Sequence, residues 1–204
     1  MKLLIAIPTL DYMHSEFVKS LIGLISKLEC RYEISIQSGT LVYMARDTLA
    51  KKAINENFDF VLWLDSDMVF QPTLLEDLQF SGRDFVTGVY QARRPGFMSC
   101  VFEKIDLDSF RPCEKYPRST FQVEGCGFGC VLISTAILKH VMQTYKTCFM
   151  PVKDYGEDIA FCLRVRDLGY KLYCEPSAIC GHIGHITVYP EDHEAYLAKL
   201  ELMK

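Results

Sequence analysis

The sequence predicts an α/β fold in which one domain has a mostly parallel central sheet flanked by helices. Short apolar runs alternate with segments whose apolar residues recur at helical spacing, and this order is typical of parallel sheets covered by helices. Half of the 204 residues are hydrophobic, which is enough for one core without covalent cross-links. The nine cysteines are odd in number, irregularly spaced and without a CxxC pair, so they indicate neither a disulfide framework nor a ribbon-type zinc site.

Strands and helices take turns along residues 1–90. The runs at 2–7 and 60–64 are apolar, as in buried strands, and Pro72 stands where a helix would begin. The predicted elements are a strand at 2–7, a helix at 16–28, a strand at 32–36, a helix at 42–54, a strand at 60–64, a helix at 73–80 and a strand at 84–89.

The second half of the chain is less regular. Residues 91–122 contain four turn-forming residues, Pro95, Gly96, Pro112 and Pro117, which predict irregular loops and edge strands. The remaining predicted elements are a glycine-rich turn at 125–129, a strand at 130–134, helices at 135–143 and 157–168, a strand at 171–174, a loop or strand at 179–188, and an amphipathic helix at 191–203.

Charge and hydropathy exclude several classes of partner. The net charge is −4 and no dense Lys/Arg tract occurs, which argues against nucleic-acid binding, although Arg93 and Arg94 could serve a phosphate. The apolar run at 1–7 is too short for a signal peptide, and no other run approaches the roughly twenty residues of a membrane span. We therefore expect a soluble, cytoplasmic protein with no transmembrane segment.

Two carboxylates separated by one residue, Asp65 and Asp67, directly follow the apolar strand at 60–64. Ligands collect at the carboxyl ends of strands in open α/β sheets, and Mg²⁺ or Mn²⁺ prefers carboxylate oxygens beside substrate phosphates. This D-x-D arrangement predicts a metal site at Asp67. The alternative is a solvated turn that caps the helix near Pro72, because aspartate favours such positions through local hydrogen bonds.

A second acidic pair, Glu157 and Asp158, opens the predicted helix at 157–168. Acidic residues in a first helical turn are stabilised by the helix dipole, by about 0.3–1 kcal/mol each, so the pair could be purely structural. In the functional interpretation, one of the two carboxylates faces an acceptor in a cleft.

Two histidines, His182 and His185, lie among glycines that let the backbone approach a ligand closely. Neutral imidazole is a good Mn²⁺ ligand. Two alternatives remain, which are hydrogen-bonded surface histidines and a zinc site formed by Cys174, Cys180, His182 and His185.

The order of these segments resembles a family 2 glycosyltransferase of the GT-A fold over nearly the whole chain. The last block is also similar to the polypeptide N-acetylgalactosaminyltransferases, in which a G-G-E-N helix precedes a V-G-H with a metal-binding histidine. Asp47 departs from the family, which more often has Asn there. The matching segments are IAIPTL at 5–10, MARDTLA at 44–50, LWLDSDM at 62–68, GCGFGCVLI at 125–133, and GED at 156–158 through GY at 169–170 to GH at 181–182.

The resemblance implies one Rossmann-like GT-A catalytic domain over 1–204. Residues 1–90 would form the nucleotide-sugar-binding half, 91–190 the acceptor-binding and metal-completing half, and 191–204 a C-terminal helix. The implied ligands are Mn²⁺ or Mg²⁺, a UDP- or GDP-sugar donor, and a carbohydrate or other hydroxyl acceptor.

The resemblance also implies a role for each candidate residue. Asp67 would be the main metal ligand, helped by Asp65 and His182, with His185 as a second choice for metal or phosphate. Glu157 and Asp158 would be catalytic residues on the acceptor side, with Asp158 as general base if the enzyme inverts. The donor would contact Pro8, Thr9, Asp11, Arg46, Asp65 and Ser66.

Rival interpretations stay open. The family 2 likeness favours inversion, whereas the block at 156–182 is also similar to retaining enzymes. A sugar-nucleotidyltransferase would normally have a glycine-rich basic loop after its first strand, and residues 7–11 contain no glycine. The sequence is also compatible with a non-catalytic domain that binds nucleotide-sugar or carbohydrate, and with a structural zinc protein.

Overall fold

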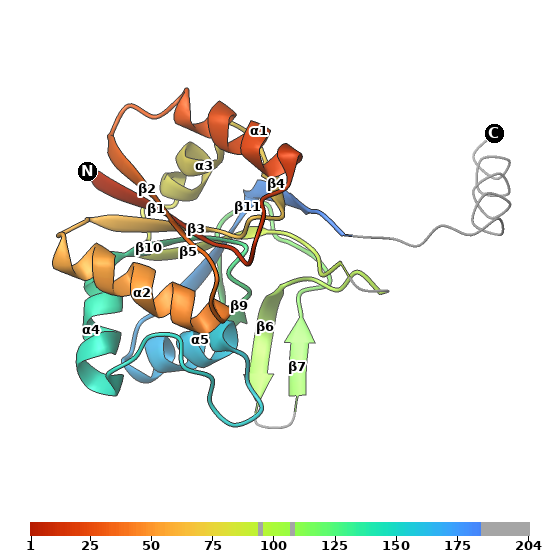
Figure 1. Cartoon of the computed structure of the whole chain (residues 1–204). Helices are drawn as coiled ribbons and strands as arrows, with labels where there is room; N and C mark the ends of the chain where they lie inside the picture. Colours follow the sequence, from red (N-terminus) through yellow and green to blue (C-terminus); the bar gives the residue numbers. More distant parts are fainter. Residues whose placement is uncertain (94–95, 107–108, 185–204) are drawn as a thin grey trace, which may run out of the picture.

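A computed structural model describes residues 1–93, 96–106 and 109–184, which form a central sheet with helices on both faces (Figure 1). The eight strands of this sheet follow the order β2-β1-β3-β10-β5-β11-β4, and β8 pairs with β11. Their bounds are β1 Lys2–Pro8, β2 Arg31–Gln37, β3 Phe60–Leu64, β4 Met68–Phe70, β5 Phe85–Val89, β8 Phe121–Val123, β10 Cys130–Ser134 and β11 Leu172–His182.

A smaller antiparallel sheet and the helices complete the described chain. The small sheet has the order β7-β6-β9, and it projects from one end of the central sheet (Figure 1). Its strands are β6 Val101–Asp106, β7 Ser109–Pro112 and β9 Gly125–Cys126. The helices are α1 Ser15–Ile25, α2 Val42–Asn55, α3 Leu74–Phe80, α4 Thr135–Tyr145 and α5 Glu157–Asp167.

The central sheet is mixed, so the prediction of a mostly parallel sheet is wrong. The pairs β1–β2, β1–β3 and β5–β11 are parallel, but β10 runs antiparallel to both of its neighbours, and β4 and β8 run antiparallel to β11. A parallel connection needs a long crossover, usually a helix. Between β5 and β10 the chain forms the small sheet instead, and it re-enters beside the end of β3, where Cys130 lies opposite Leu64.

Side chains that alternate along the strands divide the core into two layers. In β1, Leu4 and Ala6 pack on the side of α2, α4 and α5, whereas Leu3, Ile5 and Ile7 pack on the side of α1 and α3. This two-residue period is the one that β geometry imposes on a sheet buried on both faces.

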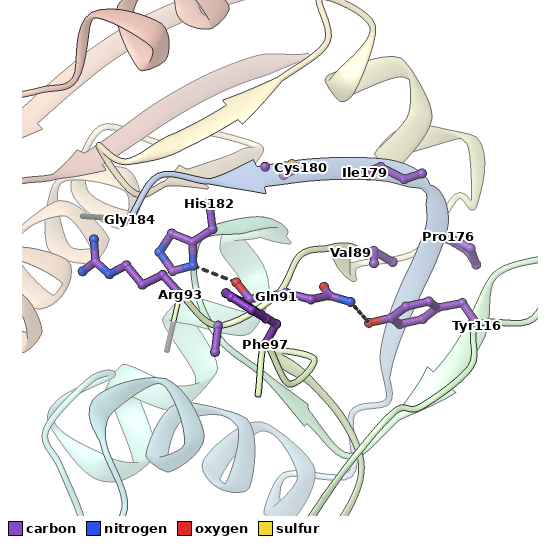
Figure 2. A pocket seen from close by; sticks show the side chains of 12 residues that line it. Val89, Gln91, Arg93, Phe97, Tyr116, Pro176, Ile179, Cys180, His182 and Gly184 are labelled. Carbon is purple, nitrogen blue, oxygen red and sulfur yellow. Dashed lines mark hydrogen bonds between the residues drawn. The ribbon is translucent and has the colours of Figure 1, made fainter. Parts of the chain in front are cut away.

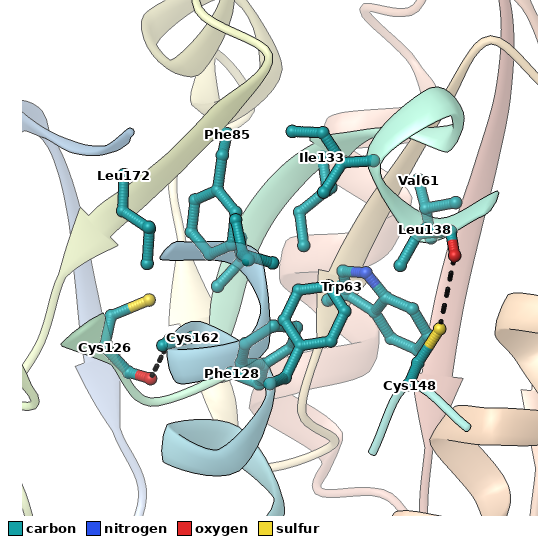
Figure 3. Packing of buried hydrophobic residues seen from close by; sticks show 14 of the residues in the cluster. Val61, Trp63, Phe85, Cys126, Phe128, Ile133, Leu138, Cys148, Cys162 and Leu172 are labelled. Atoms are coloured by element: carbon teal, nitrogen blue, oxygen red, sulfur yellow. Dashed lines mark hydrogen bonds between the residues drawn. The ribbon is translucent and has the colours of Figure 1, made fainter. Parts of the chain in front are cut away.

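An aromatic cluster fixes the strand that leads to the acidic turn (Figure 3). Trp63 in β3 is fully buried, with its ring centroid 5.1 Å from that of Phe149 and 6.0 Å from that of Phe128. Phe149 also stacks on Phe161 of α5 at 4.6 Å. Aromatic pairs at these separations stabilise a core beyond the area they bury, so the end of β3 rests on a rigid base.

Most predicted elements lie where the sequence places them, and two differ. The strand predicted at 171–174 and the start of the loop or strand predicted at 179–188 form one strand, β11, whose register on β5 shifts between Cys174 and Ile179. Residues 185–188 lie outside the described residues. The short strands β4 and β9 were not predicted. The helix at 191–203 lies outside the described residues. Among the described helices, none has both the length and the apolar character needed to cross a membrane.

Candidate functional site

A cavity of about 830 Å³ lies at the carboxyl ends of β1 and β3. Ligands collect at this end of the strands in open α/β sheets. The first turn of α2 also lines it through Leu41 and Val42, and helix N-termini favour anions. The cavity, termed here the strand-end cavity, brings together the predicted donor and metal residues Pro8, Thr9, Asp11, Arg46, Asp65, Ser66, Asp67 and His182.

The acidic turn after β3 is tied to two neighbouring elements. The backbone N–H of Asp65 donates to the carbonyl of Gly129 at 3.2 Å, just before β10. The N–H of Ile183 donates to the carbonyl of Asp67 at 2.8 Å, just after β11. Both carboxylates therefore project from a backbone whose position is set by the sheet.

Arg46 of α2 is a buried cation that organises one side of the cavity. It is 3% exposed, and its Nη2 donates to Asp65 Oδ1 at 2.8 Å. Its Nη1 donates to the Phe128 carbonyl at 3.4 Å, and its Nε lies 3.5 Å from Glu157 Oε1 without a hydrogen bond. A buried guanidinium is costly unless it is paired, so Arg46 requires both carboxylates.

The pKa of the Asp65 carboxyl is raised to about 6. Burial is the largest cause, and the negative charges of Asp67, Glu157 and Asp158 act in the same direction, while the charge of Arg46 opposes them. Desolvation and like charges both disfavour the ionised form. The ionised state of Asp65 therefore depends on its ion pair with Arg46.

Asp67 faces a different set of partners. The Nη1 of Arg93 donates to Asp67 Oδ2, and His182 Nε2 lies 3.5 Å from the same oxygen. Burial raises the pKa of Asp67, but the interaction with His182 and the charge of Arg93 outweigh it, so the pKa is lowered overall. The pKa of His182 is raised, chiefly by its interaction with Asp67 and against the effect of burial.

The second nitrogen of His182 shows which atom could bind a metal. His182 Nδ1 lies 2.9 Å from the carbonyl oxygen of Gln91, which can only accept (Figure 2). Nδ1 must therefore carry a proton, which leaves the lone pair of a neutral imidazole on Nε2, beside Asp67. A carboxylate oxygen and an imidazole nitrogen suit Mn²⁺, so Asp67 and His182 fit such an ion, whereas Asp65 is paired with Arg46.

Among residues 1–93, 96–106 and 109–184, no three His, Cys, Asp or Glu side chains converge in a metal-binding group. Metal sites completed by substrate phosphates and water use as few as one or two carboxylates, so Asp67 and His182 do not need a third protein ligand. The proposed zinc ligands Cys174 and Cys180 are both buried. His185 lies outside the described residues.

The second acidic pair lies in the first turn of α5 and is absent from the described lining of the strand-end cavity. Glu157 is linked to this cavity through Arg46, whose Nε lies 3.5 Å from Glu157 Oε1. Asp158 Oδ1 accepts from the N–H of Ile159 at 2.7 Å. The pKa of Asp158 is raised by burial and by the charge of Glu157, which makes its ionised form a stronger base.

Asp47 of α2 has partners that give it a structural role. Its Oδ1 accepts from the backbone N–H groups of Cys148 and Phe149 at 2.9 and 2.8 Å, and its Oδ2 accepts from the Thr147 hydroxyl at 2.5 Å. Charged acceptors form strong bonds to backbone donors. Asp47 therefore fixes the segment that carries Phe149 into the aromatic cluster.

Two features of the site are not evident from the sequence. The sequence indicates Arg93 only as a possible phosphate contact, and its pairing with Asp67 depends on a loop whose path the sequence does not reveal. The Tyr90 hydroxyl accepts from the N–H of Gly129 at 2.9 Å and braces the turn before β10. A tyrosine directly after a buried strand is the only signal for that role.

Comparison with known proteins shows the fold. No family model and no curated protein matches the sequence. Among solved structures, GalNAc-T7 with UDP, GalNAc and Mn²⁺ is similar at a TM-score of 0.59 and 11% identity. The similarity covers 91% of this chain and 44% of GalNAc-T7. The fold is GT-A-like.

A second structure, A197 from STIV, is similar over most of both chains. The TM-score is 0.63 at 19% identity, and the similarity covers 91% of this chain and 87% of A197. At these identities both comparisons show the GT-A-like fold alone. What the strand-end cavity does must therefore be argued from its own residues.

Proposed function

We propose that the protein is a metal-dependent glycosyltransferase that moves a sugar from a nucleotide-sugar donor to an acceptor hydroxyl. One observation carries the proposal: a single cavity at the strand ends joins Pro8, Thr9 and Asp11 to Asp67 and His182. Such a cavity could bind the nucleotide against Pro8, Thr9 and Asp11, and a metal ion at the carboxylate of Asp67 and the imidazole of His182. The GT-A-like fold, similar to that of a protein solved with UDP, GalNAc and Mn²⁺, also supports it.

Each part of the cavity has a proposed task. Pro8, Thr9 and Asp11 would contact the base and ribose of a UDP- or GDP-sugar, and Ser66 would contact the donor beside the acidic turn. Arg46 would act near the donor sugar or diphosphate, either directly or by holding Asp65. The first turn of α2, which carries unpaired N–H groups, would favour the diphosphate.

Departure of the nucleoside diphosphate builds negative charge on its phosphate oxygens. A Mn²⁺ or Mg²⁺ ion held by Asp67 and His182 would stabilise that charge when bound. Arg93 lies on Asp67 and is half exposed, so its guanidinium can also turn toward a phosphate. His185 remains a proposed second contact for metal or phosphate.

An inverting reaction needs a base within hydrogen-bond reach of the acceptor hydroxyl. Asp158 is the proposed base and Glu157 its proposed catalytic partner. The raised pKa of Asp158 supports this assignment, because a base is most effective when its pKa lies near the working pH. The acceptor-side half would span 91–190, and the acceptor would be a carbohydrate or another hydroxyl compound.

The test combines a donor panel with one pair of variants. Purified protein is titrated with UDP-, GDP-, CMP- and TDP-sugars with and without Mn²⁺, and the melting temperature and released nucleotide are measured. We expect stabilisation by one nucleotide class that requires Mn²⁺, with slow donor hydrolysis. Asp67→Ala should remove the Mn²⁺ dependence and lower turnover by about 100-fold or more. Its circular dichroism spectrum should match that of the wild type, which shows that the variant is folded.

Asp154→Ala is the matched control, because Asp154 is exposed and outside the strand-end cavity. Full activity of Asp67→Ala would overturn the metal assignment. Donor binding without hydrolysis or transfer to any acceptor would instead favour the non-catalytic binding domain.

A further inference from the structure

A second cavity, of about 600 Å³, shares two residues with the strand-end cavity. Figure 2 shows the side chains that line this second cavity. Arg93 and His182 line both cavities and therefore form the boundary between them. We call the second one the apolar cavity, and the described residues that line it are Val89, Gln91, Ala92, Arg93, Phe97, Tyr116, Pro176, Ile179, Cys180, Gly181, His182 and Gly184.

The apolar cavity leaves large hydrophobic side chains in contact with water. Phe97 is 67% exposed and Ile179 is 66% exposed, and Val89 and Pro176 also line the cavity. A cluster of exposed apolar side chains around a concavity marks a binding site rather than ordinary surface. Because the apolar cavity lies next to Asp67 and His182, we expect its ligand to take part in the reaction proposed for the strand-end cavity.

The apolar cavity has few polar side chains besides Arg93 and His182 at its boundary, and those of Gln91 and Tyr116 bond to each other. The Gln91 side-chain amide donates to the Tyr116 hydroxyl at 3.4 Å (Figure 2). That hydroxyl donates to Ser99 Oγ at 2.6 Å. No Asp or Glu occurs among the described residues that line the cavity. A bare sugar ring buried there would lose hydrogen bonds from its hydroxyls to water without replacing them, which is unfavourable.

We infer that the apolar cavity binds an acceptor whose reactive hydroxyl is attached to an apolar body, with that body packed against Phe97 and Ile179. This inference rests on the proposed glycosyltransferase function and names its acceptor class. The hydroxyl end of the acceptor then points past Arg93 and His182 into the strand-end cavity. The body supplies binding energy through buried apolar area, and the wall between the cavities directs the hydroxyl.

The reaction balances with the groups already named. A bond forms between the acceptor oxygen and the anomeric carbon of the donor, and the bond from that carbon to the phosphate oxygen breaks. The acceptor proton passes to the carboxylate of Asp158, the proposed base, and the nucleoside diphosphate leaves with the electron pair of the broken bond. The apolar body takes no part in these steps, so its removal should weaken binding more than it changes the chemistry.

The first experiment measures binding without any donor. A naphthyl glycoside and the methyl glycoside of the same sugar are titrated into the full chain, followed by ligand-observed NMR and by thermal shift. We expect the naphthyl compound to bind at least about tenfold more tightly, because its rings bury apolar area that the methyl compound lacks. Equal affinity for the two glycosides would overturn the inference.

Variants then locate the binding site. Phe97→Ala and Ile179→Ser should each weaken naphthyl glycoside binding by about fivefold or more, since each removes part of the apolar surface. Met98→Ala is the matched control, because Met98 is 62% exposed and adjacent to Phe97 but does not line the cavity. All three positions are exposed, so the variants should keep the wild-type melting temperature. Equal weakening by Met98→Ala, or none by the other two, would place the ligand elsewhere.

The experiment separates failure of the inference from failure of the proposed function. Manganese-dependent donor hydrolysis without selective naphthyl binding would overturn the acceptor class and leave the glycosyltransferase assignment standing. The protein could instead bind the naphthyl glycoside through Phe97 but neither bind nor hydrolyse any nucleotide-sugar. That result would identify the apolar cavity as a ligand site and overturn its role in glycosyl transfer.

Discussion

The two carboxylates of the acidic turn lie one residue apart, yet their surroundings differ sharply. Asp65 points to Arg46, a buried cation on α2 that belongs to the helix scaffold. Asp67 points to Arg93 and His182, which come from the loop after β5 and the end of β11. The first ion pair joins a buried guanidinium to a partly exposed carboxylate in the wall of the strand-end cavity, whereas the second pair involves a half-exposed arginine on the boundary between two cavities.

This difference indicates a division of work. A buried guanidinium is expensive to leave without its carboxylate, so Asp65 serves to hold Arg46 and to position the turn. A half-exposed arginine can leave its carboxylate at little cost, so Asp67 is free to take an incoming cation.

Removal of Arg46 should cause the largest loss of stability. Arg46→Ala leaves Asp65 and Glu157 without their cation in a mostly buried setting, and we expect a loss of about 3 kcal/mol in the free energy of unfolding. Chemical denaturation of the variant measures it. Lys52→Ala is the control, because Lys52 forms two ion pairs with more exposed partners, Glu33 and Glu56, and its removal should lower stability far less than Arg46→Ala. Equal losses of unfolding free energy in the two variants would show that burial of Arg46 adds nothing to the effect of its ion pairs.

Removal of Arg93 should strengthen metal binding. The guanidinium of Arg93 lies on the Asp67 oxygen that a cation would use, so a bound ion must first displace it. We expect Arg93→Gln to lower the Mn²⁺ dissociation constant by about three- to tenfold, because the competing charge is gone. Isothermal titration without donor measures this constant directly.

Arg111→Gln provides a matched control for that measurement. Arg111 also forms an exposed pair with a carboxylate, at 2.6 Å from Glu103, and it lies on the small sheet away from the strand-end cavity. Its removal should leave the Mn²⁺ constant unchanged. Weaker binding in Arg93→Gln would mean that Arg93 supports the ion instead of competing with it.

The same contrast explains what could be predicted from the sequence. The D-x-D turn and His182 can be proposed as site residues from the sequence alone, because the turn follows a wholly apolar strand and His182 lies in a glycine-rich segment. Arg46 was placed near the donor through the family likeness, but its burial between Asp65 and Glu157 depends on α2 and α5 packing together. Long-range pairs of this kind leave no periodic signal in a single sequence.

The direction of β10 was missed for a related reason. Its five residues, Cys130–Ser134, fit a buried strand in either direction. The connection decides the direction, and the segment between β5 and β10 contains short strands and prolines rather than a crossover helix. Phe97 and Tyr116, which line the apolar cavity, come from this same segment. No local sequence pattern therefore indicates the cavity.

The smallest expected effect is a pH-dependent contribution of the Asp67–His182 pair to stability. The pKa of His182 is raised from 6.5, so its stabilising effect is fully present below pH 6.5 and is lost as pH rises through the folded-state pKa. The pKa of Asp67 is lowered from 3.8, so its effect is present above pH 3.8 and is lost as pH falls through the folded-state pKa.

His182→Gln should therefore destabilise the protein most between about pH 4 and 6.5, by roughly 0.5–1 kcal/mol. Above that window the difference from wild type should shrink, because His182 loses its proton in the native protein. Urea denaturation at a series of pH values without metal measures the difference. His140→Gln is the control, since the ring of His140 bonds to the Tyr170 hydroxyl, which is neutral, in place of a carboxylate. A His182→Gln difference that stays constant with pH would show that the pair carries no net charge interaction, and Asp67 would then depend on Arg93 alone.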